Sequence, residues 1–369
     1  MSSKIAIVDG ASFVLPYDFQ LVAALTRHDV AQVDFYCSNT KYNMEFLNAM
    51  RSLPGVELRS YLISGSVVNR FKGVAAYVTL LFDLWRKRAL YSAINFQFSI
   101  LWPVEVLLFF LLRKKLIFTV HNAVPHGFRR RRHLPTIWLA NIARTLIFPS
   151  EFTRAEFLRR YGERNVDKAT VLPHGLLPVV PDSMPVAFPR SGRPRSLIYW
   201  STIKPYKGIE LFVELARSEA VRSKGVALEI YGAWSDELKE LKDRLIGLGV
   251  DVHDEFMGPE QLLLLLSREE TVFLLPYREA SQSGALYSLL HHGRYFICSD
   301  VGDLGAFMRR WRLDALLLRE RSVEAVLKCL DHLERCDDDT RRELEHAQQR
   351  SSWDALVPAI SSIYAPRIS

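Results

Sequence analysis

Cysteine is scarce in this chain, and its few residues are scattered. The 369 residues include four cysteines, Cys37, Cys298, Cys329 and Cys336. No pair of them stands with histidines at the spacing of a metal site, and Cys298 ends an apolar run, where a buried thiol is expected. This pattern argues against a disulfide-stapled secreted domain and favours a reducing cytosol.

Export and membrane-spanning signals are also missing. The amino terminus, MSSKIAIVDG, enters a strand-like run directly, without a charged region followed by an apolar core, so no export signal is predicted. The apolar run at residues 98–112 contains Pro103 and Glu105. It is shorter than the about twenty apolar residues that a helix needs to cross the hydrocarbon core. We expect a buried or interfacial helix there.

What the chain does have is an ordinary globular balance and a regular alternation of strands and helices. With 49% apolar and 24% charged residues, a chain of this length is expected to form two cores. The alternation favours parallel sheets covered on both faces. Strands are predicted at residues 5–8, 33–37, 56–61, 93–98, 116–120, 145–148 and 170–172, then at 197–200, 227–231, 250–252, 272–275 and 296–299.

A proline-rich segment divides these two series of strands. Residues 178–194 read PVVPDSMPVAFPRSGRP, without apolar periodicity, and predict an extended linker. The predicted domains are therefore residues 1–177 and 195–350, each Rossmann-like. Residues 351–369 follow, and their first part is an amphipathic helix.

Two loops in the second half are suited to hold an anion. In residues 198–216 and 274–286, an apolar run breaks into a polar loop and then opens a helix, which presents backbone N–H groups and a positive dipole end. The first loop carries Lys204 and Lys207. The second is built of small or uncharged residues that let a phosphate approach closely: Ser281, Gln282, Ser283 and Gly284.

The order of these segments resembles a known enzyme family. K-P-Y-K-G from Lys204, followed by P-Y-R-E-A-S-Q-S-G-A-L from Pro276, is similar to the carboxy-terminal half of family 4 type glycosyltransferases. FTVHNAVPHG (118–127) and VLPHG (171–175) resemble their acceptor-side loop and the segment that closes their first domain. The resemblance covers most of the chain. It implies an α/β protein of the GT-B fold, with two Rossmann-like domains whose parallel sheets face each other across a cleft, and residues 351–369 crossing back to the first domain.

The resemblance also implies a donor site. Lys207 matches the catalytic lysine on the donor phosphates, and Glu279 matches the first acid of the E-x7-E motif, near the sugar hydroxyls. Lys204 is expected as a second cation, because Ser201 occupies the more widespread arginine position. Further donor-binding residues are Ser201, Tyr206, Gly232, Ser281, Gln282, Ser283 and Gly284.

Two positions depart from the family pattern. The second acid, which bonds the nucleotide ribose in relatives, falls on Tyr287 or Ser288 depending on the register, and neither is a carboxylate. Ribose recognition must therefore differ. The amino-terminal Gly-Gly loop is also absent, since residues 9–12 read DGAS. That part of the phosphate cradle is expected to be reduced.

Histidines mark the acceptor side. His121-Asn122 followed by Pro125-His126 matches the family pattern H-N-x-x-P-H, which implies a catalytic role for His121 and places Asn122 and His126 beside the acceptor. His174 is either another acceptor-side residue or an interdomain hydrogen-bonding residue. No D-x-D metal site is evident, and the resemblance implies transfer without metal or cofactor.

Positive charge gathers near the apolar run of the first domain. The run at residues 129–132 is RRRR, and the chain has a net charge of +7. Such a run is either a solvated face or a contact with an anionic membrane surface, where each nearby basic residue contributes about 1 kcal/mol. No recognised nucleic-acid-binding motif accompanies it.

We therefore predict a cytoplasmic glycosyltransferase, peripheral on the inner face of the membrane. It would move a hexose from a nucleoside-diphosphate sugar to a saccharide acceptor, lipid-linked, in polysaccharide assembly, with retention of configuration. A nucleotide-sugar epimerase of the same fold and a catalytically silent binding or scaffold protein are the alternatives.

Overall fold

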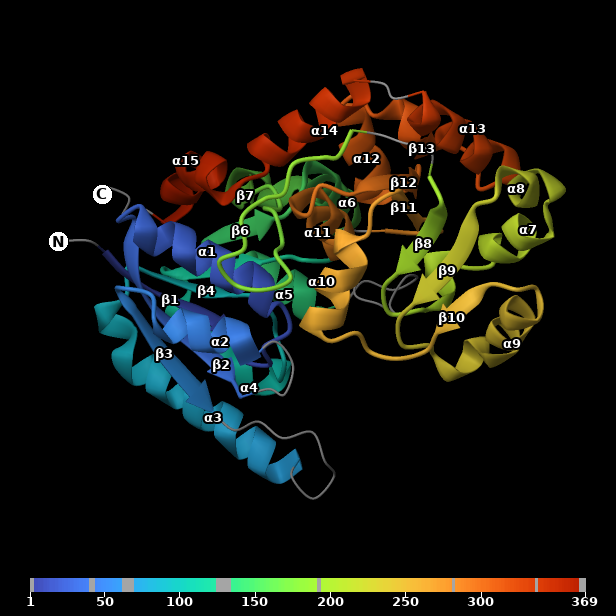
Figure 1. Ribbon diagram of the computed structural model, residues 1–369. Coiled ribbons are helices and arrows are strands. Elements are labelled where there is room, and N and C mark those ends of the chain that lie inside the picture. The colour runs from blue at the N-terminus through green and yellow to red at the C-terminus, as the bar shows by residue number, and fades with distance from the viewer. Residues whose placement is uncertain are drawn as a thin grey trace. The chain divides into compact units, whose positions relative to one another are not determined.

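The chain folds into two compact units, each built on one parallel sheet (Figure 1). The first unit comprises Met1–Gly175 with Ser351–Ser369, and the second comprises Leu176–Arg350. The computed structural model describes residues 3–39, 44–61, 70–123, 134–190, 194–280, 283–335 and 338–364.

The first unit contains a seven-stranded sheet. Its strands are β1 Ser3–Asp9, β2 Ala31–Ser38, β3 Val56–Tyr61, β4 Ala93–Phe96, β5 Leu116–Thr119, β6 Thr145–Phe148 and β7 Ala169–Val171. They lie in the order β3-β2-β1-β4-β5-β6-β7, and every neighbouring pair is parallel. The central strands are buried on both faces, which explains why the sequence shows them as nearly continuous apolar runs.

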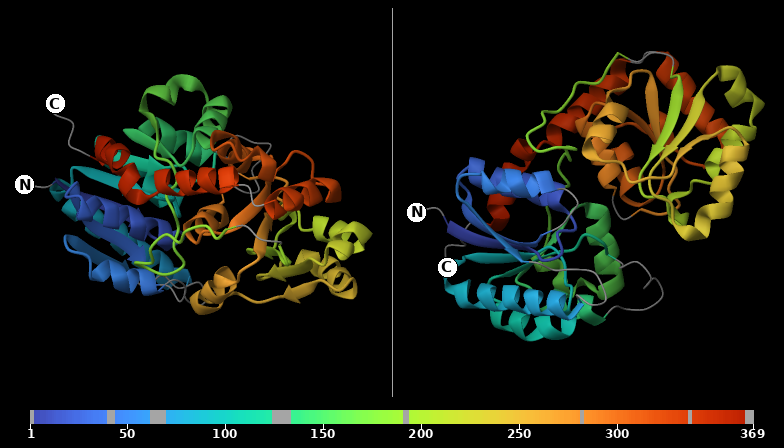
Figure 2. Two further views of the ribbon diagram at one scale, coloured as in Figure 1. Left: turned by 45° about the horizontal axis from the view of Figure 1, so that its top comes forward. Right: turned by 60° about the horizontal axis from the view of Figure 1, so that its bottom comes forward.

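Helices cover both faces of this sheet. They are α1 Leu15–Arg27, α2 Met44–Arg51, α3 Arg70–Lys87, α4 Trp102–Leu112, α5 Leu134–Ile142, α6 Glu151–Tyr161 and α15 Trp353–Tyr364, with short 3-10 turns at η2 Arg88–Leu90 and η3 Glu163–Lys168. Figure 2 shows α1 and α2 on one face of the sheet and α3 and α4 on the other. Of residues 98–112, expected as a buried or interfacial helix, residues 102–112 form α4 on the surface of the unit.

The carboxy-terminal helix α15 belongs to the first unit. Trp353 packs against Tyr17 of α1, with ring centroids 5.2 Å apart. The Tyr364 hydroxyl accepts a hydrogen bond of 2.6 Å from Asn95 Nδ2 in β4. A side chain at Gly175 would collide with the Trp353 ring, so this glycine lets the chain pass close to the helix.

The second unit contains a six-stranded sheet. Its strands are β8 Ser196–Trp200, β9 Ala227–Tyr231, β10 Asp251–His253, β11 Thr271–Leu275, β12 Tyr295–Ser299 and β13 Leu317–Leu318. The order is β10-β9-β8-β11-β12-β13, again parallel throughout. The two-residue strand β13 was not predicted, because a pair of leucines has no periodicity to reveal it.

The helices of the second unit follow the same alternation. They are α7 Leu211–Arg217, α8 Glu219–Lys224, α9 Lys239–Gly247, α10 Pro259–Ser267, α11 Gly284–His291, α12 Gly302–Arg310, α13 Val323–Glu334 and α14 Asp338–Arg350, with 3-10 turns η4 Pro205–Lys207, η5 Asp236–Leu238 and η6 Asp314–Leu316. None of the helices in the described ranges is long and apolar enough to cross a membrane.

The proline-rich segment lies against the second unit. Its described residues form neither helix nor strand, as the prolines predict. Val179 and Phe188 are nevertheless buried in the hydrophobic core, and the Tyr295 hydroxyl donates a hydrogen bond of 2.9 Å to the Pro189 carbonyl. The linker is therefore an extended segment that packs against the core of the second unit.

Candidate functional site

The lysine loop and the loop after β11 leave the second sheet at its switch point. β8 lies between β9 and β11 in the sheet. After β8 the chain continues to one side, toward β9, whereas after the neighbouring strand β11 it continues to the other side, toward β12. In open parallel sheets, ligands bind outside the carboxyl ends of the strands at this point. The fold thus brings together the two segments that the sequence singled out.

Backbone contacts hold the two loops together. Gly208 has a φ of +70°, and a Cβ on it would lie 1.9 Å from the Pro276 carbonyl oxygen, so only glycine fits there. The Arg278 backbone N–H donates a hydrogen bond of 2.8 Å to the Tyr206 carbonyl. The Arg278 Nε donates another, of 2.6 Å, to Glu210 Oε1. The two loops therefore form one rigid surface.

Lys207 lies between two tyrosine rings on this surface. Its Nζ is 3.8 Å from the Tyr277 ring centroid and 5.3 Å from that of Tyr206. Tyr277 is buried, whereas Lys207 is half-buried. A ring face attracts a cation but leaves its hydrogen-bond donors unused, so the ammonium group is held in place and can still meet an anion. Lys204 is exposed on the same loop.

The helix that follows the lysine loop begins at Leu211, after the η4 turn, and Glu210 occupies its N-cap position. The Glu210 side chain makes no hydrogen bond to the amides of α7. Its carboxylate pairs instead with Arg278 and, at 3.7 Å, with Arg321. Anion binding by the lysines and by the amino end of this helix stays a prediction.

Ser201 and Gly232, both predicted to bind the donor, lie next to each other. The Ser201 backbone N–H donates a hydrogen bond of 3.2 Å to the Tyr231 carbonyl. Gly232 has a φ of +141°, and a Cβ on it would lie 1.8 Å from the Ser201 carbonyl oxygen. The glycine is thus required for the close packing of the loops after β8 and β9. Binding of the donor by these two residues stays a prediction.

The loop after β11 leads into α11. Ser281 and Gln282 lie outside the described residues. Ser283 is buried at the N-cap of α11, and its hydroxyl donates a hydrogen bond of 3.4 Å to the Tyr277 hydroxyl. Gly284 opens the helix, and Glu279 is half-buried in the loop. The amino end of α11 thus stands beside the tyrosine that holds Lys207.

The predicted ribose positions are both buried. Tyr287 packs on Phe307, with ring centroids 5.8 Å apart, and belongs to the hydrophobic core. Burial, together with the Asp303 carboxylate, raises its pKa well above the ordinary value. The ring thus packs in the interior of the unit, and a ribose-binding role for Tyr287 stays a prediction. Ser288 is also buried, and its role stays a prediction.

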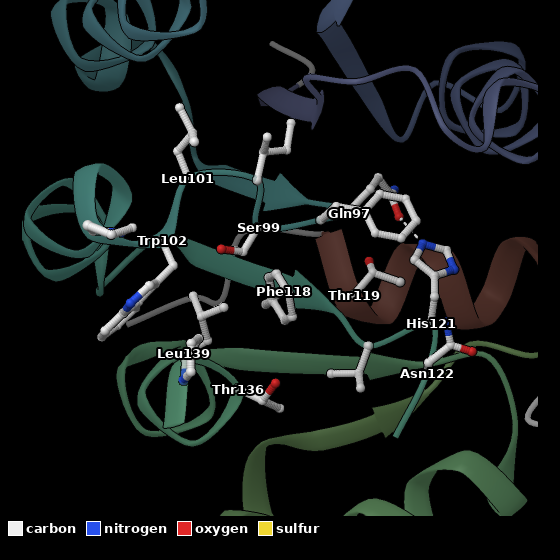
Figure 3. A pocket seen from close by; sticks show the side chains of 15 residues that line it. Gln97, Ser99, Leu101, Trp102, Phe118, Thr119, His121, Asn122, Thr136 and Leu139 are labelled. Atoms are coloured by element: carbon white, nitrogen blue, oxygen red, sulfur yellow. Dashed lines mark hydrogen bonds between the residues drawn. The ribbon is translucent and has the colours of Figure 1, made fainter. Parts of the chain in front are cut away.

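A pocket of about 440 Å³ lies in the first unit, at the carboxyl ends of β4 and β5 (Figure 3). Figure 3 shows Gln97 and His121 at one end of it and Trp102 and Leu139 at the other. Its polar lining consists of Gln97, Ser99, Thr119, His121, Asn122 and Thr136, and the remaining lining is aliphatic and aromatic. A mostly apolar pocket with a few convergent polar groups is typical of a small-molecule site.

His121 is held as a neutral imidazole at this pocket. It stacks on Phe98, with centroids 4.8 Å apart, and Gln97 Oε1 lies 2.8 Å from its Nε2. A carbonyl oxygen can only accept, so Nε2 carries the proton. Burial lowers the pKa of His121 to about 3, with the nearby His174 as a smaller cause. Among the described residues, its Nδ1 has no hydrogen-bond partner.

The other predicted acceptor-side residues are placed differently. Asn122 lines the pocket, whereas His126 lies outside the described residues. His174 is buried within the first unit, where its ring packs on Tyr17 and its Nδ1 donates a hydrogen bond of 2.7 Å to the Gly175 carbonyl. Burial lowers its pKa to about 4. His174 is therefore near His121 but is not among the residues that line the pocket.

The loop between β1 and α1 contains the buried Asp9. Its Oδ2 accepts a hydrogen bond of 3.0 Å from the Val14 backbone N–H at the start of α1. Burial raises the pKa of this carboxyl. The reduced phosphate cradle expected for residues 9–12 stays a prediction.

No metal site is evident in the described parts of the two units, where no group of three His, Cys, Asp or Glu side chains is placed to hold an ion. Metal-independent transfer stays a prediction.

The sequence did not reveal Gln97 or Tyr277. Gln97 directly follows β4, at the switch point of the first sheet, and this position is the only signal that could have singled it out. In the sequence, Tyr277 was only one residue of the P-Y-R-E run that resembles the family. Its contact with Lys207 joins residues that are far apart in sequence, so no local pattern predicts it.

Known proteins share this architecture. Residues 19–176 match the model of Glycosyltransferase Family 4, whereas no match was found among curated proteins. Anabaena HepE, solved with UDP and glucose, aligns over 98% of this chain and 99% of its own, with 15% identity and a TM-score of 0.68. α,α-Trehalose-phosphate synthase (UDP-forming) from Burkholderia vietnamiensis aligns over 99% and 100%, with 13% identity and a TM-score of 0.63. WaaG, a glycosyltransferase involved in lipopolysaccharide biosynthesis, aligns over 99% of each chain, with 14% identity and a TM-score of 0.59.

At these identities the structural likeness establishes the fold, and the family match adds the class of enzyme. The chain is a glycosyltransferase with the GT-B fold, and its residues 19–176 match the model of Glycosyltransferase Family 4.

Proposed function

We propose that this enzyme transfers a hexose from UDP-hexose to a saccharide acceptor, with retention of configuration and without a metal ion. The position of Lys207 carries the proposal, since its amine is fixed 3.8 Å from the Tyr277 ring centroid at the switch point of the second sheet. UDP is chosen because HepE was solved with it and the Burkholderia synthase is named UDP-forming.

The chemistry requires a fixed positive charge near the donor. When the bond between sugar and diphosphate breaks, the leaving phosphate oxygens gain negative charge, and a preorganised cation lowers the barrier without reorganising at that moment. Lys207 supplies this charge, and Lys204 and the amino end of α11 add to it. Glu279 is assigned to the hydroxyls of the donor sugar.

The pocket of the first unit suits a saccharide. Its volume of about 440 Å³ lies within the range of small-molecule sites. Sugars combine hydroxyl groups with apolar C–H faces, and the pocket offers Gln97, His121 and Asn122 together with the Trp102 ring. The neutral His121 can accept a hydrogen bond from an acceptor hydroxyl.

We propose further that the acceptor is lipid-linked and that the enzyme works at the cytoplasmic face of a membrane. The apolar lining of the pocket supports this assignment, and the structural neighbour WaaG is named for lipopolysaccharide biosynthesis. Cys37, Cys298 and Cys329 are free thiols, in line with a reducing compartment. The arginine run at residues 129–132 lies outside the described residues. The family match is to glycosyltransferases, which leaves the epimerase alternative without support.

Replacing Lys207 tests the donor site. Lys207→Ala should lower the turnover of UDP-hexose about a hundredfold, in line with the loss of one preorganised electrostatic contact. The matched control is Lys239→Ala, an exposed lysine on α9. Turnover is measured as UDP release. Parent-like turnover in a folded Lys207→Ala variant would refute the assignment.

A second experiment identifies the nucleotide. Thermal shifts are compared with UDP, GDP, ADP and dTDP, since a bound ligand raises the melting temperature.

A further inference from the structure

Two neighbouring helices of the first unit expose apolar side chains to solvent. On α3 these are Val74, Val78 and Phe82, spaced four residues apart. On α4 they are Val104, Leu107, Phe110 and Leu111, of which Leu107 is 67% exposed and Leu111 54% exposed. We call these seven residues the α3–α4 face. Figure 2 shows the two helices side by side on the same face of the sheet.

The fold does not need these side chains. Both helices already bury another side against the sheet, α3 through Tyr77, Leu80 and Leu84 and α4 through Leu108 and Phe109. A surface helix normally carries polar residues on the side away from the core. α4 is apolar on both sides instead, and an exposed apolar face of this kind is typical of a site of interaction.

The charges beside this face are of one sign. The exposed charged residues on α3, η2 and α4 and directly after them are Lys72, Arg86, Arg88, Arg113 and Lys114. The acids of these helices are not available to oppose them, because Glu105 is buried and Asp83 pairs with Lys87. A partner for this surface must therefore be apolar in its interior and negative at its rim.

The basic residues stand close to the apolar ones. The Arg113 guanidinium lies 4.4 Å from the Phe110 ring centroid, and that of Arg88 lies 4.5 Å from the Trp85 ring centroid. Lys115 Nζ donates a hydrogen bond of 3.0 Å to the Arg88 carbonyl, which ties the carboxyl ends of α3 and α4 together. Exposed apolar side chains with basic side chains beside them suit a bilayer interface, where the acyl boundary lies next to charged headgroups.

We propose that the α3–α4 face docks on an anionic lipid bilayer, with Leu107, Leu111 and Phe82 entering the acyl boundary and Arg86, Arg88, Arg113 and Lys114 meeting the headgroups. The inference deepens the proposed function, because it rests on the lipid-linked acceptor and names the surface that brings the enzyme to it. The face is part of the described structure and does not depend on residues 129–132.

Vesicle binding by the full chain tests this docking. At low ionic strength the parent should bind vesicles of phosphatidylcholine with phosphatidylglycerol and bind pure phosphatidylcholine weakly. The double variant Leu107→Ser/Leu111→Ser should lower affinity for the anionic vesicles about tenfold or more. The reason is that two apolar side chains, which would pass from water into the bilayer, are replaced by polar ones. The matched control is Leu264→Ser, an exposed leucine on α10 of the second unit, with 70% of its surface accessible.

A second pair of variants tests the charge. Arg113→Ser/Lys114→Ser should lower the same affinity about tenfold and weaken its dependence on salt. The control Lys239→Ser/Arg244→Ser removes two exposed charges from α9 and should change neither. Circular dichroism confirms that each variant is folded.

The outcomes are separable from those for the proposed function. UDP-hexose turnover in solution needs no bilayer, and none of the substituted residues lines the pocket or the lysine loop, so it should stay at the parent's level in all these variants. If the face variants bind anionic vesicles as the parent does, or if the parent ignores such vesicles, the docking proposal fails while the donor chemistry stands. A dimer in light scattering that the Leu107/Leu111 variant splits would assign the face to a second copy of the chain instead, and would also overturn the proposal.

Discussion

The hydrogen bond between Gln97 and His121 sets the chemical state of the acceptor-side histidine. Gln97 and His121 are both buried, and the amide oxygen accepts from Nε2 at 2.8 Å. The bond therefore selects the tautomer with the proton on Nε2 and leaves Nδ1 as an acceptor. Gln97 acts on the reaction through His121 and is a positioning residue.

Gln97→Leu should abolish this selection. It removes the acceptor of the Nε2 proton and leaves a buried donor unpaired, which costs about 1–3 kcal/mol of stability. Nitrogen NMR of the His121 ring should show protonated Nε2 in the parent at pH 5–8 and loss of this preference in the variant. Glycosyl transfer should slow, while the affinity for UDP, which is assigned to the second unit, should not change. Retention of the parent tautomer in the folded variant would contradict the role.

Asn122 and Gln97 show what a sequence motif can and cannot predict. Asn122, which follows His121 in sequence, was predicted from the family pattern and lines the pocket. Gln97 was missed, although it makes the hydrogen bond that sets the tautomer of His121. The reason is physical. A motif reports residues adjacent in sequence, whereas the partner of His121 directly follows β4, the strand that neighbours β5 in the sheet.

At the scale of elements, Glu105 shapes the segment that lines the pocket. This buried carboxylate in the first turn of α4 accepts hydrogen bonds from the Tyr77 and Ser99 hydroxyls and from the backbone N–H groups of Ile100 at 2.8 Å and Leu101 at 3.2 Å. It therefore ties α3, the segment after β4 and the start of α4 into one arrangement.

Glu105→Gln should loosen this arrangement. The amide is uncharged and keeps one acceptor oxygen for the Tyr77 hydroxyl and the two backbone N–H groups, while its NH2 replaces the acceptor of the Ser99 hydroxyl. The charge-assisted hydrogen bonds are lost, so the free energy of unfolding should fall by about 1–3 kcal/mol. The matched control, Glu151→Gln in the first turn of α6, changes an exposed acid and should stay within about 0.5 kcal/mol. Urea unfolding measures both. Equal stability of the two variants would show that Glu105 does not organise the segment.

The elements themselves were largely predictable, for a reason visible in β4 to β6. Each of these strands is buried on both faces, so its sequence is a short apolar run bounded by polar residues. The exposure of one side of α4 was not predictable. Its apolar residues occur all around the helix, so periodicity cannot tell the core side from the solvent side. The η4 turn before α7 was not predicted, because the turn that ends at Gly208 depends on contact with Pro276.

At the scale of the whole molecule, each unit buries ionisable groups in their neutral forms. Burial lowers the pKa of His121 and His292 to about 3 and that of His174 and His291 to about 4. Burial also raises the pKa of Asp18 well above the ordinary aspartate value, with the charge of Asp9 as a second cause. The two sets make stability depend on pH in opposite directions.

The histidines should make the enzyme less stable in mild acid. Their unfolded pKa is about 6.5, so below that value the unfolded chain binds protons that the folded chain rejects. Their contribution is fully present above about pH 6.5 and is lost as the pH falls toward the folded values. Asp18 has the opposite sign, because the folded chain keeps a proton that the unfolded chain releases above about pH 4, so its contribution decreases as the pH rises.

Two variants of the first unit separate these contributions between pH 7 and pH 5. His174→Gln keeps a donor for the Gly175 carbonyl but cannot take up a proton, so it should flatten the fall in melting temperature that the parent shows on acidification. Asp18→Asn removes the opposing contribution and should steepen that fall. Each group is worth on the order of 1 kcal/mol per pH unit, which calorimetry of the full chain resolves. If both variants follow the parent's pH dependence, then His174 and Asp18 have ordinary pKa values in the folded enzyme, and the unit does not hold them in their neutral forms.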